Sequence, residues 1–103
     1  MSDIINARIT GTMLGLEDHG IMTSFVHLEW DSGGVSLGGF VLGGQSGIKF
    51  IQRTLEVVGV EKWEDLEGKY VRVETEGLGS PVRGIGNILK EEWLYPKDFF
   101  KES

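Results

Sequence analysis

Apolar and polar residues alternate along two stretches of the chain, and each stretch predicts a β-strand. In residues 4–14, Ala7 and Ile9 fall on one side and polar residues on the other, the two-residue period of a half-buried strand. Residues 69–76 alternate in the same way, with Val71 expected to point inward. Both stretches therefore predict strands with one face on a core.

A third stretch, residues 21–30, is apolar on both faces. Val26 and Leu28 share one face of the expected strand, while Ile21 and Phe25 share the other. A glycine-flanked polar turn precedes this stretch, so it is predicted to fold back as an antiparallel partner of the first strand. One face then meets the core, and the other needs cover from the C-terminal tail or another subunit.

The chain contains one stretch with helical periodicity, residues 47–58. At 100° per residue, its apolar half is centred on Ile51 and Leu55. Ser46 fits the N-cap position, where its hydroxyl can accept a bond from a free backbone N–H group. Gly59 fits the position just after the helix, where a left-handed residue closes the last turn. The sequence therefore predicts an amphipathic helix with both ends marked.

The remaining elements complete an α+β fold in one domain. Residues 35–42 predict a third strand interrupted by a bulge at residues 38–39, and residues 82–89 predict a fifth. Residues 92–100 carry four aromatic side chains, so this tail is expected to dock on the body, with Pro96 in the first turn of a short helix. We expect an antiparallel sheet of about five strands in the order β-β-β-α-β-β, with the helix packed across one face.

Charge and composition indicate which partners and which cellular location to expect. The net charge is −6, and Arg8 is the only cation in the first 44 residues, so direct nucleic-acid binding is not expected. An acidic surface either keeps the protein soluble or mimics nucleic acid for a basic partner. The chain has no cysteine, no apolar run of membrane length and no basic start typical of a signal peptide. We expect a cytoplasmic protein without a membrane partner.

The glycine-rich entry to the helix is the candidate ligand site. Backbone N–H groups at a helix start attract anions, and arginine and lysine can complete a phosphate site. The stretch matches neither GxxxxGK[ST] nor GxGxxG, so the alternative is a strand-to-helix turn that needs glycine for its geometry. The candidate residues for a small phosphorylated ligand are Gly44, Gln45, Ser46, Gly47, Lys49, Arg53 and Arg83.

The sequence contains few candidate catalytic or metal-binding residues. Glu17, Asp18 and His19 are neighbours in a turn, but adjacent turn residues point in different directions and the chain has no HExxH spacing. His27 is expected to be a packed or interface histidine. No serine lies in a GxSxG elbow. We therefore expect no catalytic residue, no metal site and no cofactor.

Glycine pairs recur at residues 33–34, 38–39 and 43–44. They either expose a flat backbone surface to a planar ligand or another chain, or serve two turns and one bulge. Flat edges, together with the second apolar face of residues 21–30, predict a homodimer or a larger closed assembly. On this interpretation Phe25 lies in the interface.

Four segments of the chain resemble a group of small phage and prophage proteins. They are TMLGLEDHGI at residues 12–21, GGFVLGG at 38–44, FIQRTLEVVGVEKWEDLEGKYVRV at 50–73 and IGNILKEEWLYPKDFF at 85–100. The resemblance implies an intracellular, phage-encoded accessory protein, and it implies no activity or catalytic residue.

Small acidic phage proteins often counteract host defences, and by analogy we expect a non-enzymatic binding protein of this kind. It would sequester a nucleotide-like signal or inhibit a host defence protein. A protein-capping inhibitor or nucleic-acid mimic without a small-molecule site is the alternative. A metal-dependent phosphoesterase using Glu17, Asp18 and His19 is a more distant one.

Overall fold

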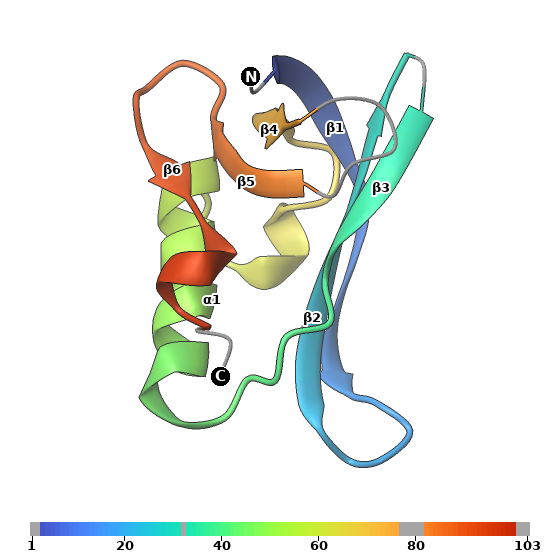
Figure 1. Ribbon diagram of the computed structural model, residues 1–103, viewed down its shortest axis with the longest axis vertical. Coiled ribbons are helices and arrows are strands. Elements are labelled where there is room, and N and C mark those ends of the chain that lie inside the picture. The colour runs from blue at the N-terminus through green and yellow to red at the C-terminus, as the bar shows by residue number, and fades with distance from the viewer. Residues whose placement is uncertain (1–2, 32, 77–81, 101–103) are drawn as a thin grey trace.

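The computed structural model describes residues 3–31, 33–76 and 82–100, which form one antiparallel sheet with a helix against it (Figure 1). The predicted α+β class is confirmed, with six strands in place of five. Their order across the sheet is β3-β2-β1-β4-β5-β6. The strands are β1 (Asp3–Leu16), β2 (Met22–Trp30), β3 (Gly33–Gly38), β4 (Tyr70–Thr75), β5 (Val82–Asn87) and β6 (Trp93–Leu94).

Strand β1 joins the two halves of the sheet. It pairs with β4 over residues 3–8 and with β2 over residues 8–16, so only Arg8 has a partner on both sides. A register shift between Ile9 and Gly11 marks a bulge beyond this point. Strand β6 was not predicted, because its two residues are too few to show the alternation of a strand.

Helix α1 spans Gly44–Val58 and begins three residues earlier than predicted. Gly43 is the N-cap and makes no side-chain cap bond, so the N-cap prediction for Ser46 is wrong. The reason is local, since Gly44 adopts a left-handed conformation (φ 65°) that turns the chain into the helix without a capping hydroxyl. The prediction for Gly59 is confirmed, because this residue is left-handed (φ 89°) and donates its N–H to the Leu55 carbonyl.

The buried face of α1 is rotated from the one predicted. Residues Gly47, Phe50, Thr54 and Val57 are buried, whereas Leu55 is only partly buried. Thr54 is a polar residue, yet its hydroxyl donates to the Phe50 carbonyl at 2.8 Å and so carries no unsatisfied group into the core. A hydrophobicity wheel counts threonine as polar and therefore centred the face too close to Leu55.

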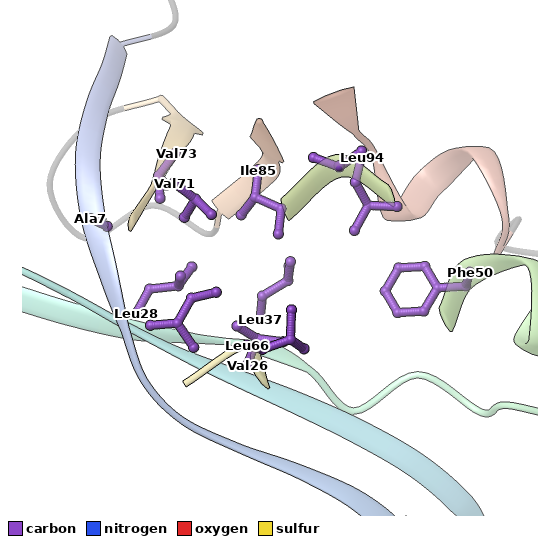
Figure 2. Packing of buried hydrophobic residues seen from close by; sticks show 12 residues of the cluster. Ala7, Val26, Leu28, Leu37, Phe50, Leu66, Val71, Val73, Ile85 and Leu94 are labelled. Atoms are coloured by element: carbon purple, nitrogen blue, oxygen red, sulfur yellow. The ribbon is translucent and has the colours of Figure 1, made fainter. Parts of the chain in front are cut away.

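The sheet curls so that side chains from its two halves face one another across a single core (Figure 2). Leu66 follows a short 3-10 turn (Trp63–Asp65) and is fully buried in this core. Phe50 enters from the helix. The other buried apolar residues are Ala7, Ile9, Val26, Leu28, Leu37, Val57, Val71, Val73, Ile85 and Leu94.

The glycines of β3 permit close strand pairing. A Cβ atom on Gly34 would lie 2.8 Å from the Leu28 carbonyl oxygen, and one on Gly38 would lie 2.7 Å from the Phe25 Cα. The expected continuation of this strand to residue 42 is wrong, because Gly39 turns the chain with a φ of 84°. Strand pairing and turns therefore account for these glycines, and no bulge is needed at this point.

The aromatic tail docks on the start of the helix. Phe100 stacks on Phe40 with ring centroids 4.9 Å apart, and it meets the Phe50 ring edge-on at 5.0 Å. Phe99 also meets the Phe50 ring edge-on, with ring centroids 5.7 Å apart. Pro96 begins a short 3-10 helix (Pro96–Asp98), which confirms its predicted place in a terminal turn.

Candidate functional site

Three of the predicted ligand residues line a shallow groove beside the start of α1. Gly44, Gln45 and Lys49 belong to this groove, whose volume is about 570 Å³. Helical spacing brings them to one side of the helix, since residues three or four apart are neighbours on its surface. The other lining residues are Leu42, Ile48 and Gln52.

The two predicted arginines lie outside this groove. Arg53 contacts Glu56 at 3.2 Å and Glu92 at 3.7 Å, on another side of the helix. Arg83 lies on β5, where its guanidinium binds the Glu76 carboxylate. The fold therefore does not gather the cations that a phosphate site would need, and an anion site rests on Lys49 alone.

Ser46 and Gly47 have local roles in the helix start. Ser46 is exposed and belongs to the first turn of α1. Gly47 is buried, and a Cβ atom there would lie 2.7 to 2.8 Å from the backbone of Leu42. Glycine at position 47 thus permits close packing between the helix and the chain leading into it.

The far end of the β1–β2 hairpin exposes apolar side chains on the face that is buried elsewhere in the sheet. Leu16 lies directly opposite Met22, and Leu14 is the next residue of β1 on that face. These side chains are 68%, 40% and 38% exposed, respectively. The same face is buried at Val26 and Leu28, so the core ends before the hairpin does.

This apolar area continues to the helix start. The N–H of Leu42 donates to the Met22 carbonyl at 2.9 Å, and Leu42 lines the groove together with Ile48, which is 64% exposed. We call Leu14, Leu16, Met22, Leu42 and Ile48 the hairpin surface. Exposed apolar surface that gathers at one place on a monomer is often functional.

The exposed apolar surface thus extends beyond the face of residues 21–30 on which the sequence predicted it. Phe25 is partly buried, stacks on His27 at 6.3 Å, and packs near the positions of Gly38 and Gly39. His27 shares a hydrogen bond of 2.5 Å with the Ser36 hydroxyl but is exposed, so it is not a packed histidine, and its place in an interface stays a prediction. Ile21 on the predicted face is 38% exposed, and Leu16 and Met22 add exposed apolar surface on the opposite face of the hairpin.

The turn at residues 17–20 does not assemble a metal site. Its geometry is closed by backbone bonds, with the Gly20 N–H donating to the Glu17 carbonyl at 2.8 Å. Among the residues that the structure describes, no three histidine, aspartate or glutamate side chains gather as metal ligands. Glu17, Asp18 and His19 therefore stay separate side chains on an exposed tip.

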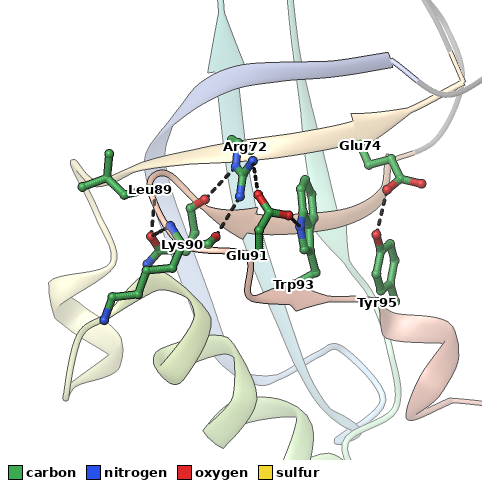
Figure 3. Close-up of polar contacts among 8 residues, drawn as sticks. Arg72, Glu74, Leu89, Lys90, Glu91, Trp93 and Tyr95 are labelled. Atoms are coloured by element: carbon green, nitrogen blue, oxygen red, sulfur yellow. Dashed lines mark hydrogen bonds and ion pairs between the residues drawn. The ribbon is translucent and has the colours of Figure 1, made fainter.

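A polar cluster that the sequence did not predict holds the loop between β5 and β6 (Figure 3). Arg72 donates to the backbone carbonyls of Asn87 and Lys90 at 2.8 and 2.7 Å, and it pairs with Glu91 at 2.9 Å. The bonds from Arg72 lower the pKa of the Glu91 carboxyl, with a further contribution from the Trp93 indole. This loop displays Leu89, which is 88% exposed.

Tyr95 provides a pH-dependent contact in the same region. Its hydroxyl donates to the Glu74 carboxylate at 2.7 Å (Figure 3), and burial followed by this bond raises the pKa of Tyr95. A raised tyrosine pKa adds stability that is fully present below the unfolded value of about 10 and is lost as the pH rises through the folded value.

We therefore expect Tyr95→Phe to be less stable than the natural chain at neutral pH, with the gap narrowing above about pH 10. Urea unfolding of both proteins between pH 7 and 11 measures this gap. A gap that is constant over the whole range would contradict the assignment, since other titrating groups are common to both proteins.

Comparison with protein-family models, curated proteins and solved structures finds no match for this chain. In the described part of the chain, no helix is both long and apolar enough to span a membrane.

Proposed function

We propose that this protein is a non-enzymatic accessory binding protein of the phage type, which inhibits a host protein by capping it through the hairpin surface. The observation that carries the proposal is the exposure of Leu14, Leu16 and Met22 on a face that is otherwise core. Exposed apolar patches on soluble proteins often mark interaction sites. The resemblance to small phage proteins supports a partner found in an infected cell.

Protein capping is favoured over capture of a phosphorylated signal. The groove beside the helix start is lined by a single cation, Lys49, and much of its lining is apolar. Arg53 and Arg83 are engaged by carboxylates elsewhere. A surface of this composition resembles the apolar centre of a protein interface more than a phosphate site, which needs several donors converging on one point.

The test is Leu16→Asp, compared with Leu89→Asp as a matched control. Both leucines are highly exposed, but Leu89 lies on the loop between β5 and β6, away from the hairpin surface. Tagged proteins are isolated from phage-infected host cells, treated with nuclease, and analysed for stoichiometric partners. We expect Leu16→Asp to reduce partner recovery at least about tenfold, because a charge would be buried at the interface centre, and Leu89→Asp to retain it.

Two outcomes would contradict capping. One is a partner that Leu16→Asp retains as fully as the natural chain does. The other is recovery of only a second copy of this chain, which would make the hairpin surface the interface of a homodimer. Circular dichroism of each variant verifies that the fold is intact, as expected for substitutions at exposed positions.

A further inference from the structure

The N-terminal half of β1 has an open backbone edge. β1 pairs with β4 from Asp3 to Arg8, but its pairing with β2 extends only from Arg8 to Leu16. Strand β2 ends at Trp30, where the chain turns into β3. Within the described residues, the edge of β1 that would meet a longer β2 therefore has no strand partner over residues 3–7.

Hydrogen-bonding groups of two residues face this open edge. Ile9 donates to the Lys69 carbonyl at 2.8 Å and accepts from the Gly68 N–H at 2.7 Å, so its backbone groups point toward the β4 side. Since these groups alternate along a strand, those of Ile4 and Asn6 point the opposite way. Neither residue makes a backbone bond across that edge within the described part of the chain.

A cleft of about 750 Å³ runs along the same edge. Four consecutive residues of β1, from Ile5 to Arg8, form one wall. Glu29 and Trp30 at the end of β2, with Asp31 just after it, form another, and Tyr70 of β4 completes the lining. The cleft therefore borders the place where further residues of β2 would lie. Its volume is within the range of about 300–1,000 Å³ that is usual for ligand sites.

The two sides of the cleft differ in chemistry. Ile5 and Trp30 lie on the core-facing side of the sheet and pack partly against the core. Among the charged residues of the cleft lining, the carboxylates of Glu29 and Asp31 outnumber the guanidinium of Arg8. In a chain of net charge −6, this balance favours basic over acidic side chains in a bound partner.

We propose that this cleft binds an extended segment of another protein that adds a strand to β1. Main-chain bonds to Ile4 and Asn6 would hold the segment, as in other cases of strand addition to an exposed edge. Side chains of a strand alternate between faces, so apolar residues of the segment would contact Ile5 and Trp30. The residues between them would be basic and lie near Glu29.

Two labelled heptapeptides test the proposal, both capped at their ends. One alternates valine with lysine and the other valine with glutamate. Fluorescence anisotropy with the full chain is expected to show saturable binding of the lysine peptide, with the glutamate peptide at least about fivefold weaker. No saturable binding of the lysine peptide up to millimolar protein, or equal binding of both peptides, would overturn the proposal.

Variants of Asn6 test whether the peptide is bound through main-chain hydrogen bonds or through side-chain contacts. Asn6→Pro removes the N–H that faces the cleft, while the bonds between β1 and β4 come from the alternate residues. We expect Asn6→Pro to weaken the lysine peptide at least about tenfold. Asn6→Ala keeps the N–H and should bind within about twofold of the natural chain. Equal binding by the proline and alanine variants would overturn the proposal.

Hydrogen exchange of the natural chain provides a readout that needs no variant. The lysine peptide should slow exchange of the Ile4 and Asn6 amides, and protection confined to other strands would count against the cleft. Light scattering identifies a different occupant. A dimer of the natural chain that Asn6→Pro dissociates would show that a second copy fills the cleft, and would overturn binding of a separate partner.

Discussion

Phe50→Ala is expected to lower the free energy of unfolding by about 3–5 kcal/mol, because it removes the aromatic ring at the centre of the contact between helix and tail. The Phe50 ring is buried and meets the rings of Phe40, Phe99 and Phe100 within 6 Å. Truncation therefore costs the burial of one ring and leaves three others facing a cavity. Urea unfolding followed by tryptophan fluorescence measures the loss.

Ile48→Ala is the control on the same helix. Ile48 is largely exposed, so removing most of its side chain should change stability by no more than about 0.5 kcal/mol. If Phe50→Ala does not fold, Phe50→Leu keeps most of the apolar volume and should cost about 1 kcal/mol. Similar losses for Ile48→Ala and Phe50→Ala would show that the aromatic cluster does not anchor the helix.

Gly38→Ala should cost about 2–4 kcal/mol, since the added methyl group would meet backbone atoms rather than a side chain that could move aside. A Cβ atom there would clash with the Ser24 carbonyl oxygen and lie 2.7 Å from the Phe25 Cα. The end of β3 would have to separate from β2 to admit it. Thermal unfolding and hydrogen exchange along β2 and β3 report the cost and its location.

Gly33→Ala is the matched control in the same strand. A Cβ atom on Gly33 would meet only the Trp30 indole nitrogen, at an ordinary contact distance of 3.7 Å. We expect this substitution to change stability by no more than about 0.5 kcal/mol. A comparable loss at both positions would mean that backbone flexibility in β3, rather than the close approach at Gly38, explains the glycines.

The sequence predicted most helices and strands because each of them repeats its pattern of apolar residues often enough to be detected. The alternation of Val71 and Val73 with polar residues identified β4, and the turn after Leu14 identified the β1–β2 hairpin. Pro96 and Gly59 were placed correctly because their conformational limits act locally. Ser46 was misplaced because a glycine pair, rather than a hydroxyl, starts the helix.

The candidate sites depend on distances between residues that are far apart in the sequence, and the spacing of apolar residues does not predict such distances. Lys49, Arg53 and Arg83 are all cations in the sequence, but only Lys49 lines the groove beside the helix start. Residues 21–30 were correctly predicted to be apolar on both faces, and Phe25 lies on the face opposite Val26 and Leu28, where it is partly buried. Periodicity did not show that the core-side face is also exposed at the end of the hairpin, at Leu16 and Met22.

The sequence by itself thus determined the α+β class, the hairpin, the amphipathic helix and the docking of the aromatic tail, because period, turn chemistry and capping act between near neighbours. Only the tertiary structure decided the hairpin surface and the cleft beside β1. Both arise where one element is longer than its neighbour. The β1–β2 hairpin extends past the core as far as Leu16, and β2 ends at Trp30 while β1 continues. Where one element ends against another is a property of the packed chain, set by contacts between residues distant in sequence.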